Sequence, residues 1–562
     1  MGSKGRVQPR HAGPERRLLR RAACSALVLA VLAPAGAPRA ANLLDADGWD
    51  LRWDNTLRYS AAFRLAHYDE ALVANSNTDD GDRNFSPGLI SNRLDLLSEL
   101  DLSNGNFGVQ ASAAAWYDTI YHQKNSNDSP ATFNSYSVPH NEFTSAVRTL
   151  HGEDADLLNA FAYGSFDVAD MPVSFRVGRH TLLWGESLYF ADNGIAAGQA
   201  PVDAIKAAAE PEAEAKELFL PVTQASMTIQ PMSSVALSAY YQFEWRRTRL
   251  PGAGSYFSDA DFLDAGGESI IEAPGQYLAR VADIKPNASG QYGVAATATL
   301  GDVDYGLYAL RFDAKEPEFF LWPGLDADPA IGRAGVYELV FPTGIDAYGA
   351  SFSTYLDDST IAGEASVRRN MPLVSQLGFA LPGGGGGGYA PTAYAALPAR
   401  PGGGAVGAQT YPTIASYAVG NTFHAQFSSV TTLSPGSLWD GADLSGEIAA
   451  NDLLQATGNA SDLDPTRTRF AAALRAVFEP KYFEVLPALD LSLPIGLGYN
   501  LVGRSSTDSS MNAGAGDVEI GVSATYHAVW QGTLTYTHFC GSPVRQPFAD
   551  RDFLSISLQR TF

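Results

Sequence analysis

The sequence has few cysteines, no long apolar run after its first segment, and none of the short motifs that bind phosphates or metals. Only two of its 562 residues are cysteine, and Cys24 lies in a leader that we expect to be removed. Cys540 then has no partner for an intrachain disulfide. No apolar run of about 18 residues follows residue 41, which excludes a membrane-spanning helix. Gly-rich phosphate loops, paired-Cys spacings and two-His helix motifs are also missing, so we expect no cofactor, no metal site and no enzymatic activity.

Basic residues are scarce relative to acidic ones. Residues 1–41 contain eight basic residues and one acidic residue, so the remainder carries 30 basic and 60 acidic residues and a net charge near −30. A polyanion such as nucleic acid is therefore not an expected partner. The acidic excess suits cations in a pore, divalent ions among lipopolysaccharide phosphates, or acidic loops that are simply solvated.

Residues 1–41 have the features of a secretory signal peptide. A basic region containing Arg16 and Arg20 precedes the apolar stretch Ala22–Ala33, and small residues follow as far as Ala41. We predict cleavage after Ala40 or Ala41 and export from the cytoplasm of a Gram-negative bacterium.

The stretch Trp49–Leu65 alternates strictly enough to identify its structure. Odd positions such as Trp53, Tyr59 and Phe63 are apolar, with one exception, whereas even positions are mostly charged or hydroxylic. Successive side chains of a strand point to opposite faces, so this pattern predicts a strand with one apolar and one polar face. Its length exceeds the usual ~5–6 residues of a soluble strand and suits a strand that crosses a bilayer. The alternative is an edge strand of a large soluble sheet.

The same alternation recurs over residues 94–102, 107–117, 235–245, 489–499, 518–526 and 554–562, with tight turns at 103–106 and 356–359. These features predict an all-β fold: a transmembrane antiparallel β-barrel of roughly 14–16 strands that forms one domain over residues 42–562. The terminal Phe562 resembles the assembly signal of outer-membrane barrels. The Gly-rich segment 380–408 is predicted to be a long loop outside the cell.

The segment Asp203–Leu220 breaks the alternation. It is rich in Ala, Glu, Lys and Leu, which are strong helix formers. Asp203 is a plausible N-cap, and Pro211 is expected to kink or split the helix. A helix cannot face lipid within an array of strands, so we predict that the inserted segment 179–221 lies in the lumen or at its mouth. A surface loop with helical character is the alternative.

Several motifs around this segment occur in an order that resembles one family. They are Arg176-Val-Gly-Arg179, Trp184-Gly-Glu-Ser187, Pro201-Val-Asp203, Lys216-Glu-Leu-Phe-Leu-Pro221 and Tyr241-Gln-Phe-Glu-Trp245. The chain is similar to the proteobacterial outer-membrane family DUF1302, a domain of unknown function. The resemblance implies a barrel that moves hydrophobic molecules through the outer membrane. It also implies a periplasmic partner with a lipoprotein fold and an inner-membrane exporter of the resistance-nodulation-division type.

Nine residues are our candidates for lining the lumen or a ligand site. They are Arg179, Trp184, Glu186, Asp203, Lys216, Glu217, Glu244, Glu364 and Arg368. We expect further contacts with outer-membrane lipid, lipopolysaccharide and the barrel-assembly machinery.

Three functions fit the sequence. The first is an outer-membrane channel for hydrophobic or amphipathic small molecules, such as steroids, aromatics or lipid-like compounds. The second is a general or cation-preferring porin. The third is an outer-membrane lipid hydrolase that would use Ser523 with His527 or His538.

Overall fold

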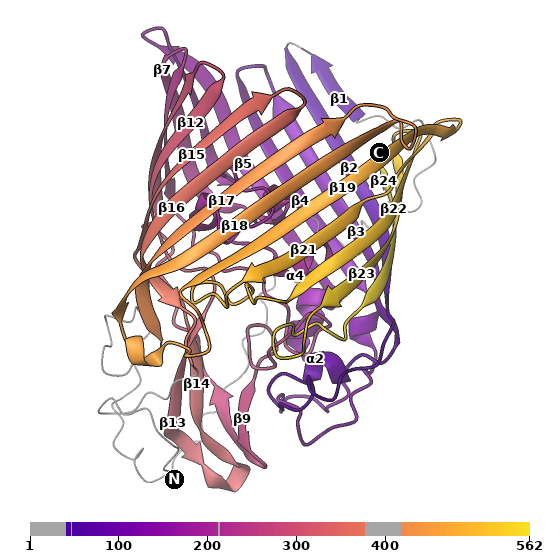
Figure 1. The fold of residues 1–562 in the computed structure, drawn as a ribbon, viewed down its shortest axis with the longest axis vertical. Coiled ribbons are helices and arrows are strands. Elements are labelled where there is room, and N and C mark those ends of the chain that lie inside the picture. Colours follow the sequence, from indigo (N-terminus) through magenta and orange to yellow (C-terminus); the bar gives the residue numbers. More distant parts are fainter. Residues whose placement is uncertain (1–40, 47, 212–213, 377–416) are drawn as a thin grey trace.

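The computed structural model describes residues 41–46, 48–211, 214–376 and 417–562. Eighteen strands form a closed antiparallel sheet around a lumen, with β20 and β21 sharing one position between β19 and β22 (Figure 1). The predicted fold class, a transmembrane antiparallel β-barrel, is confirmed.

The strands of the barrel follow one another in chain order. They are β2 (Trp49–Arg64), β3 (Gly88–Ser103), β4 (Phe107–Asp118), β5 (Glu153–Val168), β6 (Met171–His180), β7 (Val222–Met232), β8 (Val235–Gln242), β11 (Tyr292–Leu300), β12 (Val303–Phe312), β15 (Ile345–Leu356), β16 (Ser359–Leu373), β17 (Ala418–Leu433), β18 (Gly441–Gly458), β19 (Phe470–Leu486), β20 (Leu489–Ser492), β21 (Ile495–Val502), β22 (Gly516–Tyr526), β23 (Trp530–Cys540) and β24 (Phe553–Thr561).

The barrel closes where β24 pairs with β2. Their register runs from Thr56 opposite Thr561 to Arg64 opposite Phe553, and Phe562 exchanges backbone hydrogen bonds of 2.8 and 2.9 Å with Asn55. Beyond this point the short strand β1 (Ala41–Ala46) takes the place of β24 along the start of β2. Every strand of the closed sheet therefore has a neighbour on each side, as a bilayer requires of backbone groups.

The two faces of the wall differ as the alternation predicts. On β22, for example, Ile520 and Val522 point outward and are 55% and 42% exposed, whereas Glu519, which precedes Ile520 and points to the opposite face, is buried. Outward aromatic side chains, among them Tyr117 and Tyr241 at one end and Trp53 and Trp530 at the other, lie near the strand ends. An apolar belt with aromatic girdles is typical of barrels whose outer solvent is lipid.

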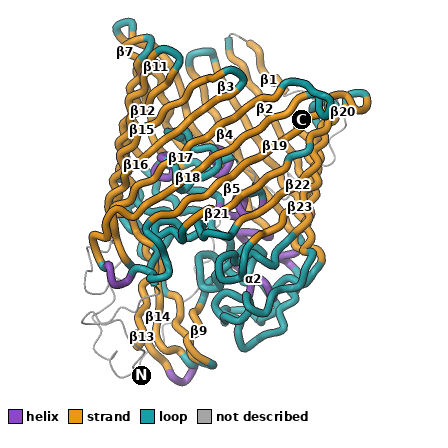
Figure 2. Tube along the Cα trace, in the orientation of Figure 1, coloured by secondary structure: helices purple, strands orange, loops and turns teal. Residues whose placement is uncertain are grey.

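The two ends of the barrel carry connections of very different length (Figure 2). One rim has short turns, such as Ala169–Asp170 and His527–Ala528, whose positive φ angles of 50–64° give the tight hairpins that suit the strand twist. At the other rim, long segments such as 119–152 and 243–291 join the strands. The chain ends of the barrel, at β2 and β24, lie at the short-turn rim.

A second sheet stands at the long-loop rim. It contains β9 (Ser269–Ala273), β10 (Gln276–Arg280), β13 (Glu318–Asp328) and β14 (Arg333–Val340) in the order β13-β14-β10-β9. Phe320, Trp322 and Tyr337 are fully buried in and around it.

Helical segments are short throughout. They are α2 (Asp80–Arg83), η1 (Ile120–His122), α3 (Ser145–Val147), η2 (Arg148–Gly152), η3 (Ile195–Gly198), α4 (Ala204–Ala209), α5 (Ala215–Leu218), η4 (Pro329–Ile331) and η6 (Ala460–Asp462). No helix in the described part of the chain has the length and apolarity to cross a bilayer.

Two details of the predicted barrel were wrong. The strand number is 18 rather than 14–16. The strand predicted over 235–245 ends at Gln242, because the chain beyond it leaves the wall and Trp245 packs against Phe341. The predicted leader up to residue 40 and the Gly-rich loop 380–408 lie outside the described residues.

Candidate functional site in the barrel lumen

The segment between β6 and β7, residues 181–221, folds into the lumen (Figure 1). It contains η3, α4 and α5. The side chain of Asp203 caps α4 by accepting a hydrogen bond from the Lys206 N–H at 3.2 Å. Helix α4 ends at Ala209, two residues before Pro211, whose ring prevents the preceding residue from continuing a helix. The predicted cap and the predicted break therefore both occur. We call residues 181–221 the lumenal insertion.

Two buried glutamates of the wall hold the backbone of the insertion. Glu364 of β16 accepts hydrogen bonds from the N–H groups of Glu186 and Ile195 at 2.6 and 2.8 Å. Glu447 of β18 accepts from three consecutive N–H groups, those of residues 188–190, at 2.5–3.0 Å. Carboxylates that accept several backbone donors form strong, directional contacts, so these two side chains fix the path of the insertion.

A cation and an amide complete this attachment. Arg368 of β16 donates to the carbonyl groups of residues 192–194 at 2.7–3.0 Å. Asn193 inserts between β17 and β18, where its Oδ1 lies 3.0 Å from His424 Nδ1 and its Nδ2 lies 3.2 Å from Gln426 Oε1. The insertion is thus attached to β16, β17 and β18 by polar contacts that only a folded wall can bring together.

The other end of the insertion reaches the opposite part of the wall. Glu210, just after α4, accepts a hydrogen bond from Arg58 of β2 at 2.9 Å. Asp203 accepts from Arg249 of the β8–β11 connection at 2.7 Å. Since β2 and β16–β18 lie far apart around the barrel, the insertion crosses the lumen rather than following one side.

A cavity of about 510 Å³ lies between α4 and the wall formed by β24, β2, β3 and β4. Much of its surface is apolar: Ile90, Leu97, Trp116, Ile205 and Phe257 are examples. Hydroxyl and amide groups such as Ser60 and Gln559 are interspersed. This combination suits a ligand with a hydrocarbon body and a few polar groups.

The charges in this cavity are largely paired. Arg58 pairs with Glu210, and Lys206 pairs with Glu217 at 3.0 Å and approaches Glu210 at 3.9 Å. Arg93 pairs with Asp95 at 2.7 Å. A paired charge attracts a bare ion weakly, but it still offers hydrogen bonds to a polar group.

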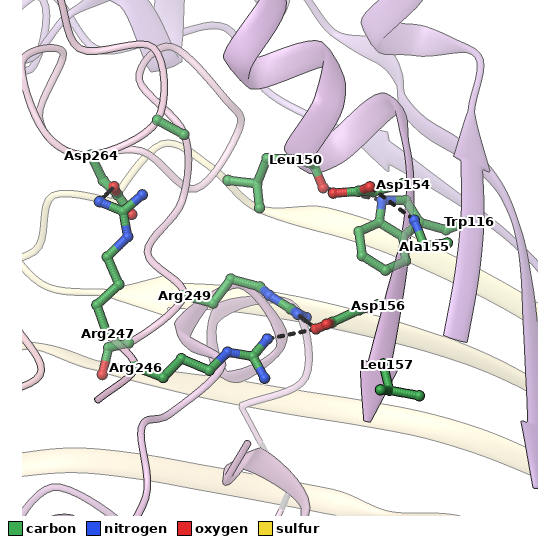
Figure 3. Close-up of a pocket in the computed structure, with 12 residues that line it drawn as sticks. Trp116, Leu150, Asp154, Ala155, Asp156, Leu157, Arg246, Arg247, Arg249 and Asp264 are labelled. Atoms are coloured by element: carbon green, nitrogen blue, oxygen red, sulfur yellow. Dashed lines mark hydrogen bonds and ion pairs between the residues drawn. The ribbon is translucent and has the colours of Figure 1, made fainter. Parts of the chain in front are cut away.

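A second cavity, of about 470 Å³, lies at the long-loop end, where β5 extends beyond the end of β6 (Figure 3). Asp154 and Asp156 of β5 form one side, and the arginines of segment 246–249 form the other. Asp156 binds Arg246 at 2.6 Å and also contacts Arg249. Three guanidinium groups, including that of Arg179 at 3.8 Å, surround this one carboxylate.

Trp116 separates the two cavities, and it lines both together with Leu150 and Arg249. The guanidinium groups of Arg93 and Arg249 lie 5.1 and 5.6 Å from its ring centroid. Cation–π contacts of this kind hold an aromatic ring in one orientation. Trp116 is therefore held in place between the two cavities.

His151 lies at the loop end of the larger cavity in its neutral form. Its Nε2 accepts a hydrogen bond from the Gly252 N–H at 3.0 Å, and its ring stacks on Tyr121. Burial, followed by the charges of Arg93 and Arg249, lowers the pKa of His151 to about 3. This histidine ties segment 243–291 to the end of η2.

Six of the predicted residues lie at the lumen, in four different roles. Asp203 and Glu217 belong to the paired charges of the insertion, and Glu186 lines a smaller cavity of about 190 Å³ beside Tyr308. Trp184 packs against Tyr240 with ring centroids 5.0 Å apart. Glu364 and Arg368 bind the backbone of the insertion.

The remaining three candidates do not line any of the three cavities described above. Arg179 belongs by register to the outward row of β6 with Val177, and only its guanidinium approaches Asp156. Glu244 accepts from the Thr223 N–H and hydroxyl groups at 2.9 and 2.7 Å and fixes the turn after β8. Lys216 is exposed and pairs with Glu214.

Sequence reasoning missed Glu447, Trp116, Asp156 and Arg249. The sequence contains a signal for Glu447 and Trp116: each occupies a position in the polar row of an alternating strand and so faces the lumen. Asp156 and Arg249 lie next to a strand end and in a long connection, where alternation carries no information.

The proposed Ser–His pair of a hydrolase does not form. Ser523 is opposite Thr533 in the β22–β23 register, whereas His538 is opposite Val518, roughly 16 Å away along the strands. His538 Nδ1 instead lies 2.6 Å from Asp552 Oδ2. His527 lies in the turn after β22, four residues from Ser523.

Closure of the sheet, the outward apolar belt and the polar lumen define a transmembrane β-barrel of the outer-membrane type. The sequence matches a family described as "Protein of unknown function (DUF1302)" over residues 21–562, and the chain belongs to that family. None of the curated proteins matches it.

The solved structures that this chain is similar to include proteins of two bacteria. OccAB4 and OccAB1 of Acinetobacter baumannii are 8% and 9% identical, each with a TM-score of 0.40. Both alignments cover 91% of this chain; they cover 97% of OccAB4 and 96% of OccAB1. OccK1 (OpdK) of Pseudomonas aeruginosa is 11% identical with a TM-score of 0.37, covering 91% of this chain and 98% of its own.

Proposed function

We propose that this protein is an outer-membrane channel for hydrophobic or amphipathic small molecules. The observation that carries the proposal is the 510 Å³ cavity inside a closed barrel, with an apolar surface and paired charges. Its volume lies within the roughly 300–1,000 Å³ of ligand pockets in proteins. Each Å² of hydrocarbon buried there contributes roughly 25 cal/mol to binding.

The insertion favours selective passage over a general or cation-preferring porin. It crosses the lumen between β16–β18 and β2 and so occupies part of the space through which an ion would pass. The negative net charge of the chain supports a cation preference, but the carboxylates in the cavity are mostly neutralised by arginine or lysine. We therefore keep the porin as the second candidate.

Barrels of this type usually have short turns in the periplasm and longer loops outside the cell. On that basis the 470 Å³ cavity at the long-loop end faces the exterior, and the 510 Å³ cavity leads towards the periplasm. Contact with lipopolysaccharide, with the barrel-assembly machinery, and with a periplasmic lipoprotein-fold partner and an inner-membrane exporter all belong to the same proposal.

Transport into proteoliposomes tests this function. Taurocholate, an amphipathic steroid anion that crosses lipid slowly, and sucrose, a polar solute, serve as probes. We expect the purified protein to admit taurocholate faster than sucrose and taurocholate to reduce the ionic current through single barrels. Equal permeation of both solutes with an unblocked current would support the porin instead. Release of fatty acid from the liposome phospholipid would point to the hydrolase.

A further inference from the structure

Three buried aspartates meet outside the lumen, at the long-loop rim. Asp79 and Asp80 lie in the β2–β3 connection at the start of α2, and Asp261 lies in the β8–β11 connection. One carboxylate oxygen from each lies within 4.8 Å of the others. The three side chains are 0%, 3% and 1% exposed, so water does not solvate this concentration of negative charge.

Protein cations compensate only part of that charge. Among the described residues, Arg83 pairs with Asp79 at 2.5 Å, and this is the one ion pair that any of the three makes. The nearby arginines Arg64 and Arg551 bind Asp82 instead. Two buried carboxylates therefore lack an ion-pair partner, which costs several kcal/mol per ion unless a further cation is present.

Some carboxylate oxygens of these three aspartates accept no hydrogen bond. Asp80 accepts from Asn127 Nδ2 and the Asn134 N–H at 3.0 and 3.3 Å, and Asp261 Oδ2 accepts from the Asp80 N–H at 3.0 Å. Asp79 Oδ1 and Asp261 Oδ1 are fully buried and have no hydrogen-bond partner in the described part of the chain. Buried polar atoms without a partner are uncommon in folded proteins, and here two of them belong to one group of three carboxylates.

We propose that Asp79, Asp80 and Asp261 bind a calcium ion. Carboxylate oxygens are the ligands that hard divalent cations prefer, and Ca²⁺ takes oxygens at about 2.3–2.6 Å. Three carboxylate oxygens that lie within 4.8 Å of one another can therefore share one such ion. Mg²⁺ demands near-ideal octahedral geometry and gives up its waters reluctantly, so a buried group of protein carboxylates suits Ca²⁺ better. Nothing in the proposed transport function requires this ion.

The ion would join three loops that are distant in sequence. Asp79 and Asp80 belong to segment 65–87, Asp261 belongs to segment 243–291, and Asn127 and Asn134 attach segment 119–152 to Asp80. Segment 243–291 also supplies Tyr256 and Phe257 to the larger cavity. Calcium therefore stiffens the loops that close the outer end of the lumen.

Calcium binding to the purified full-length protein tests the proposal. After treatment with EGTA, the protein is titrated with CaCl₂ and, separately, with MgCl₂, by calorimetry and by thermal unfolding. We expect one saturable Ca²⁺ site, a higher unfolding temperature with Ca²⁺, and a weaker response to Mg²⁺. Hydrogen exchange should slow in segments 75–85, 125–135 and 255–265 only when Ca²⁺ is present.

Substitutions identify the site. Asp261→Asn keeps the size of the side chain and removes one charge, and we expect it to lower Ca²⁺ affinity on the order of tenfold or more. Asp128→Asn, at an exposed position of the same loop cluster, should bind Ca²⁺ like the parent. Asp79→Asn gives a second test should Asp261→Asn fail to fold. Equal Ca²⁺ binding by the parent and a folded Asp261→Asn or Asp79→Asn variant, as copurified lipopolysaccharide would give, overturns the proposal, and so does an absence of saturable binding.

Discussion

Arg249 joins the lumenal insertion to the long-loop end of the barrel through Asp203. Its Nη1 donates to Asp203 Oδ2 at 2.7 Å, at the N-terminal cap of α4. The other terminal nitrogen contacts Asp156 on the inner face of β5. One guanidinium therefore sets the position of α4 relative to the wall and to both cavities.

Replacing Ala204–Leu218 with a short Gly-Ser linker should open the lumen. The linker removes α4, α5 and one wall of the 510 Å³ cavity, while the contacts of Glu364 and Glu447 with residues 186–195 remain. We expect higher single-channel conductance and loss of the preference for taurocholate over sucrose, with the barrel still assembled. Lys216→Gln, an exposed point change in the same segment, is the control. Parent-level conductance and selectivity in the linker variant would show that the segment does not restrict passage.

Trp116→Ala should merge the two cavities. Trp116 is held between Arg93 and Arg249 and is the largest of the three side chains that line both cavities, so its removal takes away most of the material between them. We expect a clear rise in conductance and faster sucrose entry, measured in planar bilayers and proteoliposomes. Trp530→Ala removes an outward-facing tryptophan of the belt and should leave both quantities unchanged. If the two variants have the same conductance and the same rate of sucrose entry, the permeation route does not pass Trp116.

Glu447→Gln should loosen the insertion without removing it. The carboxylate accepts three backbone N–H groups, and each such charge-assisted bond contributes roughly 1.5–3 kcal/mol. Glutamine has one acceptor oxygen and a donor that would face these N–H groups. We expect frequent brief openings in single-channel records and faster hydrogen exchange over residues 186–195. Glu484→Gln, at an exposed position of the short-turn rim, is the control. A single-channel record of Glu447→Gln without brief openings would contradict the anchoring role of Glu447.

Phe562→Ser should lower the yield of assembled barrel. Phe562 pairs with Asn55 at the closing seam and lies in the outward row of β24 with Ile556 and Leu558. A serine there loses an apolar contact with lipid while the backbone hydrogen bonds remain possible. The assembled fraction can be measured from the anomalous gel migration of unheated protein, since a closed barrel has no free edge from which to unravel. Unchanged assembly would show that the terminal aromatic ring is incidental.

Acid should weaken the attachment of segment 243–291 through His151. Burial holds the folded pKa of His151 at about 3, below the unfolded value of about 6.5, so the unfolded state takes up the proton first. The stabilising contribution of this neutral histidine is complete above about pH 6.5 and declines as the pH falls towards 3. At pH 5 the loss is about 2 kcal/mol. Exchange at residues 250–256, corrected for intrinsic rates, should accelerate between pH 7 and 5 in the parent and less in His151→Gln.

The sequence determined the wall of this protein. Alternation in Trp49–Leu65 and in the C-terminal strands specifies which side chains face lipid. Successive side chains of a strand point to opposite faces, so the apolar residues share one face and the polar residues share the other. The cap at Asp203 and the break near Pro211 were also readable, since both depend on neighbouring residues alone. The number of strands could not be predicted from the sequence alone, because small errors in the length of each turn accumulate around a closed sheet.

Only the tertiary structure decided what the lumen contains. Glu364 and Glu447 meet the insertion across 178 and 257–259 residues of sequence, and Asp156 meets Arg249 across 93. Asp79 and Asp80 likewise meet Asp261 through loops that carry no periodic pattern. Such contacts arise when closure of the barrel brings distant strands together, and no local signal in the chain encodes their pairing.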